Sequence, residues 1–228
     1  MLYILAEWLN FEGIFNLVRY QTFRAGATLM TALVIGLVIG PRFIAMLRIR
    51  QGKGQPIRED GPVSHLSKVG TPTMGGLLIV GALLTSTLLW ARLDNGYVWI
   101  VLFVTMGFGL IGFADDYAKV SKQNVKGVPG KVRIALGLLI ALVASYWAAT
   151  LHPVELEYRL ALPVFKDVLW NMGYLFLPFA MFVIVGAANA VNLTDGLDGL
   201  AIMPVMIASG ALGVIAYTVG RVDFSEYL

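Results

Sequence analysis

Long apolar runs separated by short polar segments dominate the chain. Six runs carry almost no charge and lie at about 25–47, 73–91, 97–114, 134–151, 172–190 and 199–219. A helix that crosses a membrane needs about 20 mostly apolar residues, and each run reaches or approaches that length. The pattern predicts an all-α, polytopic transmembrane protein in which residues 1–228 form a single transmembrane domain with six spans.

Two local features refine this prediction. Gly40-Pro41 falls inside the first run, so we expect that helix to bend or end near the interface and to continue as a short extension. Residues 1–19 contain Glu7 and Glu12 but no Lys or Arg before Arg19, whereas a signal peptide has a positive amino-terminal region. We therefore expect about 1–19 to form a retained helix at the membrane interface.

Composition supports a membrane environment. The chain is 58% hydrophobic and 14% charged, with a mean hydropathy of +0.76, whereas soluble domains carry about 25% charged residues. Such a chain cannot cover itself with polar surface in water, so lipid is its expected solvent. Cysteine is absent, which excludes disulfides and thiolate metal sites within these residues.

The basic residues predict an orientation. With six spans, the segments 41–72, 115–133 and 190–198 share one side and hold 11 of the 17 Lys and Arg residues, against 6 on the other side. Cytoplasmic loops carry the excess of Lys and Arg in membrane proteins. The first side is therefore predicted to be cytoplasmic, and both termini are predicted to be periplasmic.

The first polar motif runs from Asp60 to Gly76 and joins a basic loop to the second apolar run. Thr71 and Pro72 are typical of a helix start, with Thr71 as the cap and Pro72 at the first helical position. A helix amino terminus offers unpaired N–H groups to an anion, and His65 and Lys68 lie just upstream. The alternative is an ordinary capped helix that follows a solvated loop.

The second motif is the acidic pair Asp115-Asp116 at the expected end of the third span. The two carboxylates repel each other, and the carboxyl end of a helix already carries negative partial charge. A bound Mg²⁺ or a nearby lysine would relieve that cost. Acidic groups at membrane depth are functional candidates, although two interfacial aspartates in water remain an alternative.

The third motif, Asn189 to Gly199, is expected to form a short loop between the fifth and sixth spans. It would present Asn189, Asn192, Asp195 and Asp198 to a polar ligand. It lacks the twelve-residue pattern of a calcium loop. The alternative is a plain connecting turn, which would not explain two aspartates.

A basic run from Lys119 to Arg133 follows the acidic pair and includes Lys126 and Lys131. Such a run is usually the signal of a cytoplasmic loop, but opposite an acidic pair it could also bind phosphate groups. Magnesium commonly bridges carboxylates and substrate phosphates, and phosphoryl transfer depends mainly on positioning and charge neutralisation. The three motifs together indicate a Mg²⁺-assisted transfer between a soluble pyrophosphate donor and a lipid phosphate.

The same motifs resemble the polyprenyl-phosphate N-acetylhexosamine-1-phosphate transferase superfamily, and within it the bacterial muramoyl-pentapeptide transferase branch. The strings that carry the resemblance are Thr-Pro-Thr-Met-Gly-Gly at 71–76, Gly-Phe-Ala-Asp-Asp-Tyr at 112–117 and Asn-Leu-Thr-Asp-Gly-Leu-Asp-Gly at 192–199. The resemblance covers the whole chain, which would correspond to the amino-terminal two-thirds of a family member.

The resemblance implies a reaction and its partners. UDP-N-acetylmuramoyl-pentapeptide would give phospho-N-acetylmuramoyl-pentapeptide to undecaprenyl phosphate, forming lipid I and releasing UMP. The enzyme would be a homodimer in membrane lipid of the bacterial inner membrane, with its active site facing the cytoplasm and no nucleic-acid partner.

It also implies residue roles. The catalytic residues would be Asp115, Asp116 and Lys68, with Asp115 and Asp116 as ligands of Mg²⁺. The family's main metal-binding aspartate is expected beyond residue 228, so these residues alone are expected to be inactive. The substrate-binding residues would be His65, Thr73, Lys126, Lys131, Arg133, Asn189, Asn192, Asp195 and Asp198.

The sequence leaves three alternatives open. A related enzyme would transfer N-acetylglucosamine-1-phosphate from its UDP-sugar to the same lipid. A transporter or channel would also carry intramembrane acids, but the charges here gather at one membrane face. An inactive fragment could serve as a scaffold.

Overall fold

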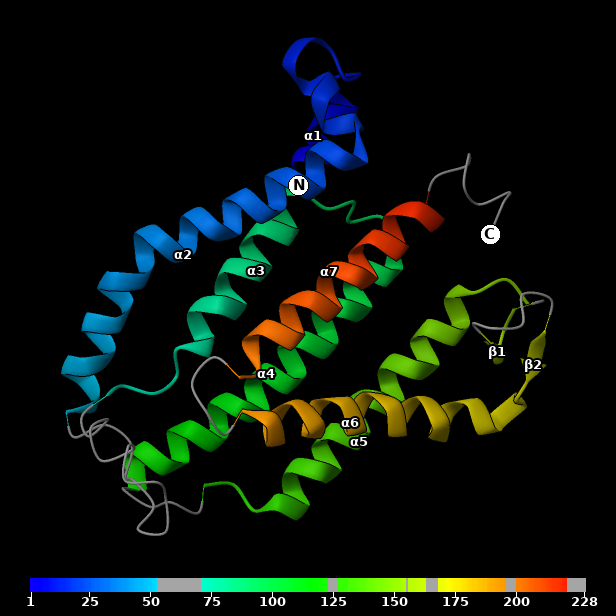
Figure 1. The fold of residues 1–228 in the computed structure, drawn as a ribbon. Helices are drawn as coiled ribbons and strands as arrows, with labels where there is room; N and C mark the ends of the chain where they lie inside the picture. The colour runs from blue at the N-terminus through cyan, green and yellow to red at the C-terminus, as the bar shows by residue number, and fades with distance from the viewer. Residues whose placement is uncertain (53–70, 123–126, 155, 163–167, 196–199, 221–228) are drawn as a thin grey trace. The chain divides into compact units, whose positions relative to one another are not determined.

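The computed structural model describes residues 1–52, 71–122, 127–154, 156–162, 168–195 and 200–220 (Figure 1). The chain divides into two compact units, Met1–Ile140 and Ala141–Leu228. Helices predominate in both.

The amino-terminal region forms two short helices where the sequence predicts one. The α-helix α1 spans Leu2–Trp8, and the 3₁₀-helix η1 spans Gly13–Arg19. Asn10 and Phe11 between them, and Gly13 at the start of η1, have φ values of 52°, 55° and 56°. Helical φ values are negative, so a single helix over 1–19 is wrong.

The helix α2 spans Gln21–Gln51 and runs through Pro41 without ending. Proline has no N–H, so the carbonyl of Leu37 loses its helical donor at this point. Figure 1 shows α2 changing direction in its second half, which contains Pro41. The expected bend is therefore present, while the expected end of the helix lies ten residues farther on, at Gln51.

The helix α3, Gly76–Trp90, packs antiparallel against α2. At one end of this helix pair Trp90 Nε1 donates to Thr31 Oγ1 at 2.9 Å, and at the other end Gln51 contacts Thr73. With 15 residues, α3 is shorter than a typical span. It is followed by α4, Gly96–Lys122, and α5, Gly130–Leu151, which begins in the first unit.

The second unit contains α6, Phe176–Thr194, preceded by the 3₁₀-helix η3, Gly173–Leu175, and α7, Ile202–Val219. A small antiparallel sheet joins β1, Arg159–Ala161, to β2, Leu169–Asn171, with Leu160 opposite Trp170. The expectation of an all-α fold is therefore corrected by one short hairpin.

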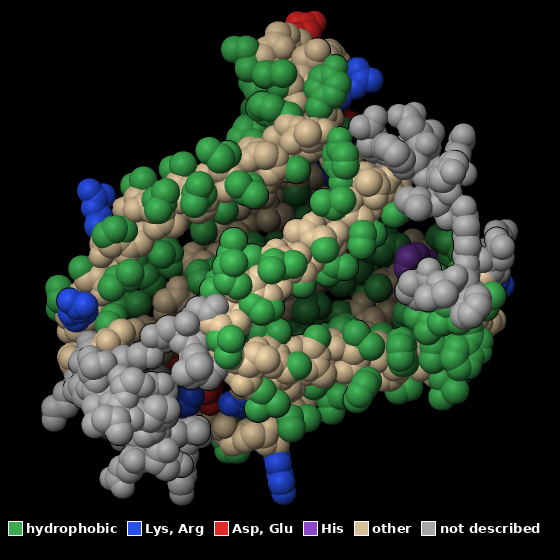
Figure 2. Space-filling view, viewed as in Figure 1, with side chains coloured by type: hydrophobic (Ala, Val, Ile, Leu, Met, Phe, Trp, Pro, Cys, Tyr) green, Lys and Arg blue, Asp and Glu red, His purple; other side chains and the backbone are tan. Residues whose placement is uncertain are grey.

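Within the part of the chain that the structure describes, five helices are long and apolar enough to cross a membrane, namely α2, α4, α5, α6 with η3, and α7. Figure 2 shows hydrophobic side chains covering the long helices and charged side chains near helix ends. Leu37 on α2 is 67% exposed and Phe182 on α6 is 74% exposed, as expected for surfaces that face lipid. The polytopic helical class is confirmed, while six spans and periplasmic termini stay predictions.

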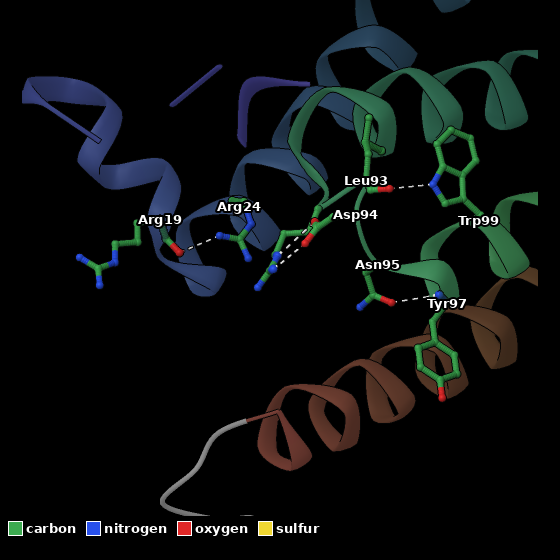
Figure 3. Close-up of polar contacts among 8 residues, drawn as sticks. Arg19, Arg24, Leu93, Asp94, Asn95, Tyr97 and Trp99 are labelled. Carbon is green, nitrogen blue, oxygen red and sulfur yellow. Dashed lines mark hydrogen bonds and ion pairs between the residues drawn. The ribbon is translucent and has the colours of Figure 1, made fainter. Parts of the chain in front are cut away.

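Polar contacts order both the amino-terminal region and the connection between α3 and α4 (Figure 3). The guanidinium of Arg92, in that connection, lies 5.0 Å from the ring centre of Tyr3 and so joins the two regions. Arg24 donates to the carbonyls of Val18 and Arg19, and its guanidinium lies 4.9 Å from the ring centre of Tyr3. Trp99 Nε1 donates to the Leu93 carbonyl at 2.8 Å. This network occupies the end of the α2–α3 pair opposite to Gln51 and Thr73.

Candidate functional site

The segment that precedes α3 is not helical. The helix begins at Gly76 with Gly75 as its cap, so the predicted start at Thr71 and Pro72 is wrong. Met74 has a φ of 69°, which interrupts any helix that began earlier. Thr73 instead pairs with Gln51, the last residue of α2, which lies 22 residues away in sequence.

Gln51 contacts both main-chain groups of Thr73. Its Nε2 donates to the Thr73 carbonyl at 3.0 Å, and its Oε1 accepts from the Thr73 N–H at 2.9 Å. The main chain of Thr73 is thereby satisfied without a helix, as buried or half-buried backbone groups require.

The side chain of Thr73 reaches α4. Thr73 Oγ1 donates to Asp116 Oδ2 at 2.8 Å. Both side chains are half-buried. The first and second motifs of the sequence therefore meet in space.

Asp115 has a separate environment, because sequence neighbours on a helix point about 100° apart. It is 7% exposed. Its Oδ2 lies 2.6 Å from Lys119 Nζ and 3.7 Å from a terminal nitrogen of Arg133, and its Oδ1 accepts from the Val128 N–H at 2.8 Å. The buried charge is balanced by one cation from its own helix and one from α5.

Gly127 makes this arrangement sterically possible. Its φ is 54°, in the left-handed region that favours glycine. A Cβ atom at this position would collide with Asp115 Oδ1 and would lie 2.9 Å from Lys119 Cε. The turn at Gly127 and Val128 therefore closes directly over the Asp115 carboxylate.

The sequence predicts that the acidic pair ends its helix, and the structure shows that it does not. The helix α4 continues to Lys122, so Lys119 sits one turn beyond Asp115 on the same face. The sequence predicts that either a bound Mg²⁺ or a nearby lysine offsets the repulsion between the two carboxylates. Within the described residues, Asp115 has such a lysine, Lys119. No group of three or more His, Cys, Asp and Glu side chains gathers within the described ranges.

These contacts test whether the acids fit a magnesium ion. Mg²⁺ takes oxygen ligands and is usually held by one or two carboxylates together with substrate phosphates and water. Both oxygens of Asp115 are occupied by cations and an N–H group. The neutral hydroxyl of Thr73 contacts Oδ2 of Asp116, so Asp116 is the better ligand of the two.

The other predicted residues fall into three groups. His65, Lys68, Lys126 and Asp198 lie outside the described residues. Lys131 is exposed, and Arg133 is half-buried against Asp115, both in the first turn of α5. Asn189, Asn192 and Asp195 belong to the second unit.

The third motif is more helical than expected. Asn189 and Asn192 lie within α6, which ends at Thr194, and Asp195 caps it. Asn189 Nδ2 donates to the Val185 carbonyl one turn earlier at 2.8 Å, while Asn192 and Asp195 are exposed. The prediction that the loop begins near residue 190 is therefore wrong by about one helical turn.

Sequence reasoning missed Gln51, Gly127 and Val128 as parts of this site. The spacing of Asp115 and Lys119 is a recognisable i,i+4 pair on a helix. The contact from Gln51 to Thr73 has no comparable signal, because it joins residues that are distant in sequence.

Known protein families match the segments that contain Thr73 and Asp116. A family model described as glycosyl transferase family 4 matches residues 98–227, and a phospho-N-acetylmuramoyl-pentapeptide-transferase signature matches residues 68–80. The chain is similar to proteins named phospho-N-acetylmuramoyl-pentapeptide-transferase, with 71% identity to that of Ruegeria sp., 68% to that of Ruegeria pomeroyi and 64% to that of Dinoroseobacter shibae. Each alignment covers 100% of this chain and 63% of the relative.

Proposed function

This chain belongs to glycosyl transferase family 4, and we propose that it transfers phospho-N-acetylmuramoyl-pentapeptide from its UDP derivative to undecaprenyl phosphate. The products would be lipid I and UMP. Support comes from the names of relatives that are 64–71% identical along the whole chain. Because the chain spans 63% of the length of these relatives, the activity is proposed for the intact protein.

One contact carries the proposal. Thr73 lies in the segment 68–80 that matches the transferase signature, and Asp116 lies in the segment 98–227 that matches the family model. The 2.8 Å hydrogen bond between their side chains joins these two segments at a single polar site. The pairing is what a site assembled from both motifs would require.

The two aspartates receive different roles in this proposal. Asp116 would hold Mg²⁺ together with substrate phosphates, and Mg²⁺, when bound, supplies charge neutralisation to the phosphates. Asp115 would position Lys119 and Arg133, the two cations that contact it. Fixed cations of this kind stabilise the charge that spreads over a transferring phosphoryl group.

Other residues complete the proposed site by resemblance. Lys68 would act on the donor phosphates with the acidic pair. The expected substrate contacts are His65, Thr73, Lys126, Lys131, Arg133, Asn189, Asn192, Asp195 and Asp198. The intact protein would be a homodimer of the bacterial inner membrane, with this site facing the cytoplasm.

A comparison of two donors tests the proposal. The intact protein in detergent would be given undecaprenyl phosphate and Mg²⁺ with either UDP-N-acetylmuramoyl-pentapeptide or UDP-N-acetylglucosamine, and UMP release would be measured. We expect release only with the muramoyl donor, and loss of release when EDTA removes the metal. Release only with UDP-N-acetylglucosamine would assign the related sugar-1-phosphate reaction instead.

A further inference from the structure

Gln51 ends α2 and reaches across to the segment before α3. Its side-chain amide faces Thr73 with one donor and one acceptor, at 3.0 Å and 2.9 Å. In an antiparallel sheet, a residue of the neighbouring strand makes the same two hydrogen bonds, one to the carbonyl and one from the N–H group. Gly52, with a φ of 57°, ends the helix directly after Gln51.

The two bonds require an amide. A primary amide carries a donor and an acceptor on one planar group, whereas a carboxylate carries only acceptors. With Glu at this position, a charged oxygen would face the Thr73 carbonyl oxygen in place of a donor. An Asn side chain is shorter by one methylene and could not hold both contacts at the same separation.

Fixing the main chain of Thr73 also fixes its hydroxyl. Thr73 has a stiff χ1 because it is β-branched, so the position of Oγ1 follows from the backbone. That oxygen donates to Asp116 Oδ2 at 2.8 Å. Gln51, Thr73 and Asp116 therefore form a continuous hydrogen-bonded link from the end of α2 to α4.

We propose that Gln51 is a positioning residue, which holds Thr73 so that the Thr73 hydroxyl orients the Asp116 carboxylate toward the transferring phosphate. The inference rests on the proposed function, since Asp116 is the acid that this function needs. It adds to that site a residue which touches neither substrate nor metal and acts through Thr73.

The test compares Gln51→Glu with Gln21→Glu in the intact protein. Gln21 is the exposed first residue of the same helix, so the control adds the same charge at the opposite end. Misplacing a group by about 1 Å can cost on the order of 100-fold in rate. We expect Gln51→Glu to lower kcat for UMP release by about 10- to 100-fold with KM for the donor unchanged. The thermal midpoint of Gln51→Glu should fall only slightly below that of Gln21→Glu, because a carboxylate is less favourable at the carboxyl end of a helix than at its amino end. Gln51→Asn should recover only part of the rate.

A second measurement does not depend on turnover. Hydrogen exchange of the Thr73 N–H should be slow in the wild type and fast in Gln51→Ala, which removes the acceptor. Normal kcat in folded Gln51→Glu, or a rate loss that only follows a loss of folded protein, would overturn the positioning role while the proposed function stands. Fast exchange in the wild type would overturn the contact itself. A wild type that releases no UMP yet protects this N–H would overturn the function, and the positioning role with it, while leaving the contact intact.

Discussion

The buried ion pair of α4 offers the sharpest test of the site's energetics. Asp115→Asn keeps the shape of the side chain and one acceptor for the Val128 N–H but removes the negative charge. Lys119 and Arg133, with side chains 18% and 33% exposed, would then face each other without a counter-ion. The change isolates the electrostatic contribution of Asp115.

The expected magnitude follows from burial. Removing one partner of a buried ion pair costs about 3–5 kcal/mol, whereas exposed pairs are worth about 0–1 kcal/mol. Asp115 itself is well buried, but Lys119 keeps access to water, and the contact to Arg133 is long at 3.7 Å. We therefore expect Asp115→Asn to lower the free energy of unfolding by about 2–3 kcal/mol, which lies between the two limits.

A double-mutant cycle measures the pair directly. Wild type, Asp115→Asn, Lys119→Met and the double variant would be unfolded reversibly in mixed micelles and followed by tryptophan fluorescence. Each single variant should be less stable than the wild type, and the double variant should lose less than the sum, with a coupling of about 1–3 kcal/mol. Additive losses, within about 0.5 kcal/mol, would refute the ion pair as a stabilising contact.

Three further predictions follow from neighbouring contacts. Gly127→Ala should lower the thermal midpoint, because left-handed backbone costs about 1–2 kcal/mol without glycine and the added Cβ would meet an oxygen of Asp115. The control Gly130→Ala, where a Cβ would meet nothing within 4 Å, should leave the midpoint unchanged. Equal midpoints for the two variants would argue against this turn. The hydrogen bond from Arg92 holds the pKa of Asp94 below its ordinary value of 3.8. The stability that this pair contributes should therefore be present above pH 3.8 and should vanish as the pH falls further. An Asp94→Asn variant whose stability differs from that of the wild type by the same amount at all pH values would contradict this. Asp116→Asn should abolish UMP release while leaving the unfolding free energy near that of the wild type, and a large loss of stability would make Asp116 a structural residue.

The apolar runs predicted most of the helices, because a lipid-facing helix is recognised from its own apolar residues, whatever it packs against. The ranges 134–151, 172–190 and 199–219 correspond to α5, α6 and α7 with shifts of a few residues at their ends. The third predicted span, 97–114, corresponds to α4, which extends eight residues farther because Lys119 offsets the charge of Asp115 within the helix. Hydropathy alone ends a helix where charge begins.

The candidate site was predicted less completely for a different reason. The residue types that carry chemistry, such as Thr73 and Asp116, stand out in the sequence, and the structure brings these two together. The prediction of a helix start at Thr71 was wrong because capping rules consider only nearby residues. They could not predict that Gln51, 22 residues away, pairs with Thr73. The two roles of the acidic pair likewise depend on which side chains approach from other elements.

The most direct test of this account is the lipid product of the intact protein. Undecaprenyl phosphate, UDP-N-acetylmuramoyl-pentapeptide and Mg²⁺ would be incubated with wild type or Asp116→Asn, and the lipid fraction would be analysed by mass spectrometry. We predict lipid I in an amount equal to the UMP released by the wild type, and neither product from Asp116→Asn. Lipid I formation by a folded Asp116→Asn protein at the wild-type rate, or its absence with the wild type, would contradict the account.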